Sequence, residues 1–180
     1  MNRNNFVVFP TLLLTAFLPV AHAAPKADPQ AQLLRDMQIR ADSAAGAADQ
    51  LWALLNLTPH TTDSQLDGLS ALREAVNAMG RDASKLEAER DKLSALEQQA
   101  LDRVLPLLRE DASDTTKAIE SFNGDHTPEF PNSAEAGYAE DIRVRSEKMA
   151  STLHTFLTME HLREKESHAE VVISGGGNQH

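Results

Sequence analysis

The stretch "LLRDMQIRADSAAGAADQLWALL", residues 33–55, decides the fold of this 180-residue chain. Its apolar residues recur at alternating intervals of three and four, which is typical of a helix that packs one face against another helix, as in a coiled coil. The residues of this stripe are Leu34, Met37, Ala41, Ala44, Ala48, Leu51 and Leu55. Because the middle of the stripe is alanine, with Gly46 beside it, a partner helix can approach closely there.

Local signals set the bounds of this first helix. Asp28 followed by Pro29 is typical of an N-cap with proline at the first helical position. The helix should end near Asn56, because Thr58 precedes a proline and is pushed out of the helical region.

A second apolar stripe predicts a long central helix. Thr62 and Gln65 form a capping box at its start. The stripe then contains Leu66, Leu69, Leu72, Val76, Met79, Ala83, Leu86, Leu93, Leu96, Ala100 and Val104. Gly80 lowers the stability of the helix by an amount that tertiary packing can offset. Pro106, in contrast, removes a backbone hydrogen bond and clashes with the preceding turn. We therefore predict a break or kink of the central helix near Pro106.

The rest of the chain predicts a third segment and a final helix. Asn123 and Gly124 form a left-handed stop, and Asn132 is expected to cap the last helix, with Glu135 three positions on. The inner face of that helix is predicted to contain Tyr138, Ile142, Met149, Leu153, Phe156 and Leu157. The fold class expected is all-α: an elongated antiparallel bundle of three or four helices in one domain, residues 24–170. Residues 171–180 are expected to be a disordered, glycine-rich tail.

The first residues resemble a secretory signal. A basic residue, Arg3, precedes the apolar run Phe6–Val20, and "AHA" at 21–23 has the small-x-small pattern of a cleavage site. The run is shorter than a membrane span, which needs about 20 apolar residues, and it contains two prolines. We expect residues 1–23 to be removed, so that the mature chain is periplasmic or secreted and has no stable membrane anchor.

Composition excludes several functional classes. The chain has no cysteine, which excludes disulfides, thiol nucleophiles and cysteine-ligated metals. Its net charge is −10, and no basic stripe offsets that charge, so we expect no nucleic-acid partner. The chain also lacks a G-x-S-x-G elbow, a phosphate-binding glycine loop and the Glu-x-x-His pairs of di-metal bundles. Paired carboxylates such as Glu110 and Asp111 are expected to be solvated. We therefore predict neither an enzyme nor an organic cofactor.

The candidate metal ligands are histidines at a seven-residue interval: His154, His161 and His168. Residues seven apart share a helix face but are about 10 Å apart along the axis, so one ion cannot bridge them. Residues three or four apart can chelate, which makes Glu164 the shared ligand between His161 and His168. Such a site would need a second helix to complete it. The alternatives are an ordinary polar helix face or a face that becomes charged below about pH 6.5.

Two further features leave alternatives open. Trp52 can fill the end of the bundle or project as an anchor for a partner. His60 and His126 lie in the two predicted loops, either as solvated turn residues or as functional residues.

A short segment resembles a known motif. "NLTPHTTDSQL", residues 56–66, is similar to the Leu-Thr-x-x-Gln motif of periplasmic helical stress chaperones of the Spy and CpxP type. Thr61 stands where the motif has Gln, and there is no second copy, so no residue role is transferred.

These observations together predict an exported, non-catalytic interaction, scaffold or chaperone-like protein of the cell envelope. Its partner is expected to be another protein or a second copy of the chain. The alternative is a metal-binding or metal-responsive protein that uses the histidine stripe.

Overall fold

The computed structural model describes residues 28–56, 62–124 and 133–175. They form four α-helices, α1 (Pro29–Asn56), α2 (Thr62–Ala88), α3 (Ala95–Gly124) and α4 (Ala134–Gly175), with a short 3₁₀ helix, η1 (Arg90–Lys92), between α2 and α3. This part of the chain contains no strand. The expected leader, the chaperone-like motif beyond Asn56, His60, His126 and Asn132 lie outside the described residues.

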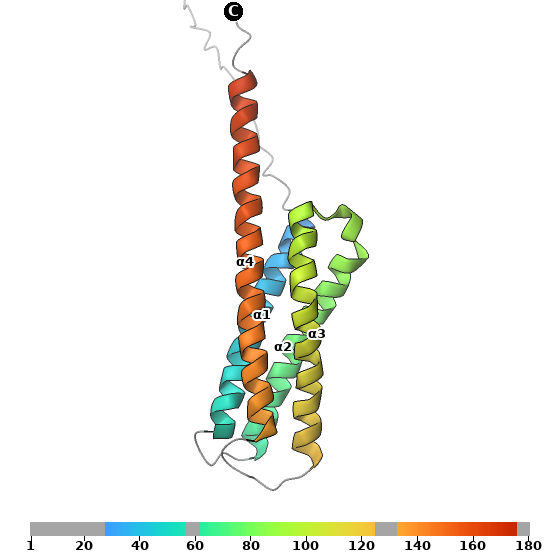
Figure 1. Ribbon diagram of the computed structural model, residues 1–180, viewed down its shortest axis with the longest axis vertical. Helices are drawn as coiled ribbons and strands as arrows, with labels where there is room; N and C mark the ends of the chain where they lie inside the picture. The colour runs from blue at the N-terminus through green and yellow to red at the C-terminus, as the bar shows by residue number, and fades with distance from the viewer. Residues whose placement is uncertain (1–27, 57–61, 125–132, 176–180) are drawn as a thin grey trace, which may run out of the picture.

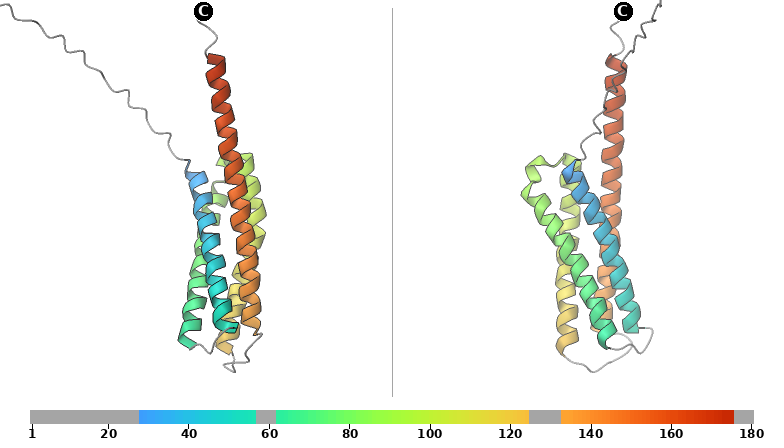
Figure 2. Two further views of the ribbon diagram at one scale, coloured as in Figure 1. Left: turned by 90° about the vertical axis from the view of Figure 1, so that its left-hand side faces the viewer. Right: turned by 180° about the vertical axis from the view of Figure 1, so that it is seen from behind.

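The helices alternate in direction and form an elongated bundle (Figures 1 and 2). Each helix packs against two neighbours, in the cyclic order α1, α2, α3, α4. This is the up-down-up-down arrangement that short connections favour. The predicted all-α bundle is confirmed.

The apolar stripe of α1 is buried along its whole length. Its alanines, rather than Gly46, allow the close approach, because Gly46 is exposed and a Cβ there would meet nothing within 4 Å. The glycine that a neighbour does approach is Gly68 in α2, where a Cβ would lie 3.3 Å from Leu51 Cδ1. Trp52 is partly buried and packs against the core, so it is not a free anchor.

The predicted break at Pro106 is wrong, because α3 continues through this residue and the chain reverses earlier, between α2 and α3. A capping box starts α3: the Ser94 backbone N–H donates to Glu97 Oε2 at 2.8 Å, and the Glu97 N–H donates to Ser94 Oγ at 3.2 Å. The "SALE" pattern at 94–97 is the sequence signal for this start. The signal is easily overlooked because the surrounding residues are strong helix formers with an unbroken apolar spacing.

Pro106 is tolerated because it lies on the outside of the bundle. Proline leaves the carbonyl of the residue four positions earlier without its helical donor. That residue is Asp102, and both it and Pro106 are exposed, so water can solvate the freed carbonyl.

Both ends of α4 differ from the expectation. The N-cap side chain is Ser133, whose Oγ accepts from the Ala136 backbone N–H at 3.3 Å. At the other end, residues 171–175, assigned to a tail from the sequence, belong to α4. The helix therefore projects beyond the other three (Figure 1). None of the described helices is both long enough and apolar enough to cross a membrane.

The glycines predict a difference in stability. Gly46→Ala should stabilise the protein by about 0.5–1 kcal/mol, because alanine is the better helix former and its Cβ meets no atom. Gly68→Ala should stabilise the protein by less than Gly46→Ala, or destabilise it, because the side chain of Leu51 must move to make room for the added Cβ. Urea unfolding of both variants measures this, and an equal gain at both positions would contradict the close packing at Gly68.

Candidate functional site

A layer of polar side chains replaces apolar residues in the middle of the α3–α4 interface. In α3 the buried spacing that starts with Leu101, Val104 and Leu108 continues through Asp111, Thr115 and Ala118. In α4, Arg145 and Ser146 lie between the buried residues Ile142 and Met149. We call Asp111, Asp114, Arg145 and Ser146 the polar layer.

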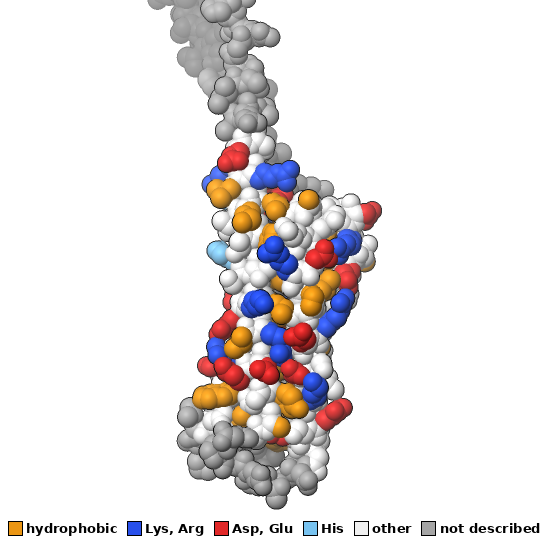
Figure 3. Space-filling view, viewed as in Figure 1, with side chains coloured by type: hydrophobic (Ala, Val, Ile, Leu, Met, Phe, Trp, Pro, Cys, Tyr) orange, Lys and Arg blue, Asp and Glu red, His pale blue; other side chains and the backbone are white. Residues whose placement is uncertain are grey.

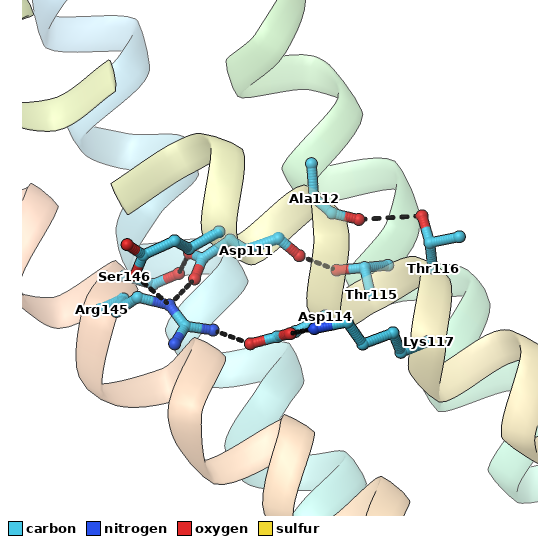
Figure 4. A network of polar contacts seen from close by, with 9 residues as sticks. Asp111, Ala112, Asp114, Thr115, Thr116, Lys117, Arg145 and Ser146 are labelled. Atoms are coloured by element: carbon cyan, nitrogen blue, oxygen red, sulfur yellow. Dashed lines mark hydrogen bonds and ion pairs between the residues drawn. The ribbon is translucent and has the colours of Figure 1, made fainter. Parts of the chain in front are cut away.

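The polar layer is joined by hydrogen bonds between the two helices (Figure 4). Arg145 Nε donates to Asp111 Oδ1 at 2.7 Å, and its Nη2 donates to Asp114 Oδ2. Ser146 Oγ donates to Asp111 Oδ2 at 2.9 Å, so both oxygens of this fully buried carboxyl group are satisfied. Lys117 Nζ completes the network by donating to Asp114 Oδ1 at 2.8 Å.

Burial gives the two aspartates different protonation behaviour. Burial raises the pKa of Asp111 to about 6, and the hydrogen bonds from Arg145 and Ser146 offset only part of that effect. Burial also opposes ionisation of Asp114, but hydrogen bonds from Lys117 and Arg145 outweigh it and hold the pKa of Asp114 below its ordinary value. Asp111 is therefore the carboxyl group of the layer that titrates near pH 6.

The expectation that Glu110 and Asp111 are both solvated is wrong for Asp111. Glu110 is exposed, but Asp111 lies one position further along the helix, on the buried stripe. The three-and-four spacing of the stripe from Val104 onward is the sequence signal that could have found it. Two adjacent carboxylates are typical of a solvated surface, but the helical register places Asp111 on the buried stripe.

The polar layer has no free group with which to act on a substrate. The Asp111 oxygens are occupied, and Arg145 is held by two carboxylates. A buried network of this kind specifies how two helices are aligned, since any other alignment leaves a charge unpaired. We therefore assign the polar layer to the register of α3 and α4.

Removing the arginine should be far more damaging than removing its neighbour on the same helix. Arg145→Met leaves two buried carboxyl groups without their shared donor, which should cost about 3–5 kcal/mol. Arg143→Met removes two ion pairs within α4, to Glu140 and Glu147, and should cost less than about 1 kcal/mol. Chemical denaturation compares the two variants, and similar losses would show that the polar layer does not stabilise the bundle.

The Asp111 pKa predicts a pH dependence of stability. Because the pKa of Asp111 in the folded state, about 6, exceeds the ordinary value of 3.8, the folded state binds a proton more tightly than the unfolded state does. The stability that this proton contributes is fully present below about pH 4 and is lost as the pH rises through 6. Relative to Asp111→Asn, the wild type should therefore lose up to about 3 kcal/mol of stability between pH 4 and pH 7. Urea titrations at both pH values measure the difference. A difference that does not change with pH, or that matches Asp141→Asn at an exposed position, would contradict the assignment.

The structure places the histidine stripe on α4, from the middle of the helix at His154 toward its C-terminal end. His154, His161 and Glu164 are exposed, and His168 belongs to the same helix. Within the described ranges, no three His, Asp or Glu side chains come together in a group that could hold a metal ion. The metal site at His161, Glu164 and His168 stays a prediction.

His161 and Glu164 nevertheless line a pocket that includes other helices. This three-helix pocket lies between the start of α1, the start of α3 and the distal part of α4. Its acidic residues also include Glu97 and Glu160. The sequence offers no signal for either of these, since nothing in a single stripe shows which residues of α3 and α4 meet.

A second concave surface lies between α2 and α3. This α2–α3 groove has a volume of about 740 Å³ and is open to solvent. Apolar side chains from both helices line it, with three basic residues and one acidic residue among them: Val76, Ala83, Leu105, Leu108, Ala112, Arg81, Lys85, Arg109 and Glu87.

On the face seen in Figure 3, acidic and basic side chains are interspersed, with hydrophobic side chains between them. Comparison of the chain with protein-family models, with curated proteins and with solved structures gave no match.

Proposed function

We propose that the chain is an exported, non-catalytic interaction protein, a scaffold or chaperone-like module of the cell envelope, that binds a protein partner through the α2–α3 groove. The observation that carries the proposal is the groove itself. It is an elongated surface between two helices with an apolar floor and charged residues among its lining. Grooves of this type accept the apolar face of an amphipathic helix.

The floor of the groove consists of side chains that the bundle itself already buries. Leu105 and Leu108 of α3 and Val76 and Ala83 of α2 line the groove and are each at most 8% exposed. A partner helix would cover the apolar area that these side chains still expose, and the hydrophobic gain is in proportion to that area.

The basic residues of the groove already have partners within the bundle. Arg81, Lys85 and Arg109 each form an ion pair with a carboxylate of α2, and their side chains remain exposed. Acidic side chains of a partner helix would share these basic groups with α2, so charge orients a partner more than it adds affinity.

Exposed apolar side chains on the second half of α4 support the same class of function. Met159 and Leu162 are exposed large apolar residues on neighbouring turns of this helix. Exposed apolar side chains on a helix that extends past its bundle are available to another protein. Export follows from the leader-like residues 1–23 and is part of the proposal.

Site-specific photo-cross-linking tests the proposal. Gly80 lines the α2–α3 groove, and a Cβ added at Gly80, or at Gly46 of α1, would meet no atom within 4 Å. A photoreactive phenylalanine analogue at Gly80 should therefore be accommodated and give a discrete adduct in the exported fraction. The same residue at Gly46 is the matched control.

The adducts distinguish the partners. A heterologous protein cross-linked at position 80 but not at 46 supports the proposal, and a dimer of the chain identifies a second copy as the partner. Identical adducts at both positions, no adduct at 80, or a chain retained in the cytoplasm would each overturn it.

The metal-binding alternative is kept as a second candidate because His161 and Glu164 both line the three-helix pocket. One histidine of the stripe thus lies beside residues of other helices, which a complete site would need.

A further inference from the structure

Two buried carboxylate oxygens in the three-helix pocket have no hydrogen-bond partner. They are Glu97 Oε1 and Glu160 Oε2. Glu97 is only 5% exposed, and its other oxygen accepts the Ser94 backbone N–H of the capping box. Buried acceptors are almost always paired in folded proteins, because an unpaired one loses its hydration without replacement. These oxygens therefore indicate a site for a donor from outside the chain.

The register of α3 and α4 brings the two glutamates together. Glu97 lies fourteen residues before Asp111 in α3, and Glu160 lies fourteen residues after Ser146 in α4. Since Ser146 bonds to Asp111 and the two helices are antiparallel, Glu97 and Glu160 face the same level of the interface about four turns away. Their meeting in one pocket follows from the alignment that the polar layer fixes.

The rest of the pocket is mainly apolar. Its walls are Ala31, Leu34, Ala100, Leu153, Phe156 and Leu157. Arg35, His161 and Glu164 are exposed residues of the same lining. In the described part of the chain, no ion pair joins Arg35 to either of the two glutamates.

We infer that the three-helix pocket binds a primary ammonium group carried on a hydrocarbon chain. An ammonium has three N–H donors and a positive charge, which match two unpaired carboxylate oxygens. The cavity measures about 30 Å³, so it accepts the ammonium head and the methylene group next to it, which would contact the apolar walls, while the rest of the chain would stay outside. The ligand class is thus an alkylamine in its protonated form.

A divalent metal ion fits the pocket less well. Three glutamates and one histidine belong to the lining, but such an ion needs its ligands to converge on one point, and the remaining walls are apolar. No group of three His, Asp or Glu side chains in the described residues has a metal-binding arrangement.

An alkylammonium group has two sources, a free amine or the side chain of a lysine in a protein partner. Both present the same head group and methylene chain. They differ in the bulk attached to the far end, because a lysine also carries backbone. This site is separate from the α2–α3 groove, so either source can bind whether or not the groove is occupied.

Titration followed by two-dimensional amide NMR of the full-length mature chain tests the inference. The probes are n-butylammonium, Nα-acetyl-lysine N-methylamide and, as the neutral control of the same size, 1-butanol. We expect saturable shifts at residues 31–35, 97–100 and 153–164 with butylammonium, with a dissociation constant below about 1 mM. Butanol should bind at least about tenfold more weakly, since it lacks the charge.

Three variants locate the site. Glu97→Gln and Glu160→Gln should each weaken butylammonium binding about tenfold, and glutamine at 97 can keep the capping box. Arg35→Gln should strengthen binding, because it removes a positive charge from the lining. Glu166→Gln, at an exposed position on α4, should change nothing.

Each outcome has a defined meaning. Binding of both amines identifies a lysine side chain as a fitting ligand, and binding of butylammonium alone identifies a free amine. Equal binding of butanol, unchanged binding in both glutamate variants, or no saturable binding of either amine would overturn the inference. Stoichiometric zinc binding that requires Glu97, without amine binding, would replace it with a metal site.

Discussion

The bundle depends on one constraint: a fully buried carboxylate, Asp111, must meet its partners on α4. Burial removes water from this group and raises its pKa to about 6, so its environment tolerates the charge only because Arg145 and Ser146 donate to it. Apolar side chains can slide past one another by a turn at modest cost, but this pair cannot. The alignment of α3 and α4 is therefore set by polar contacts, while the apolar stripes supply most of the driving force for packing.

That alignment has consequences at a distance because helices are stiff. Four turns from the polar layer, the same register places Glu97 of α3 and Glu160 of α4 at one pocket, together with the start of α1. At the layer itself every carboxylate oxygen of Asp111 is paired, whereas at the pocket one oxygen of each glutamate is not. The first arrangement fixes the register of the two helices. The second is the arrangement expected of a binding site, where a ligand completes what the chain leaves open.

Much of the fold was predictable from local patterns. The bounds of α1, the start of α2 at Thr62 and the end of α3 at Gly124 agree with capping and stop signals. The reversal between α2 and α3 was misplaced, because proline is the stronger local signal and the capping box at Ser94 is the weaker one. Pro106 does not break the helix because it and Asp102 are exposed, so the freed carbonyl is on the solvent side of the bundle. Which face a proline occupies depends on the packing of the whole bundle.

The candidate sites were less predictable than the fold. Position along a single helix was enough to place His161 and Glu164 on the distal part of α4, but not to show that Glu97 of α3 joins them at one pocket. The sequence by itself determined the helical class, most helix ends and the buried stripe of α1, since these depend on the spacing and capping of neighbouring residues. Only the tertiary structure decided the burial of Asp111, its pairing with Arg145 and the shared pocket of Glu97 and Glu160. These depend on which turns of two helices meet, and that is fixed by contacts between residues far apart in the chain.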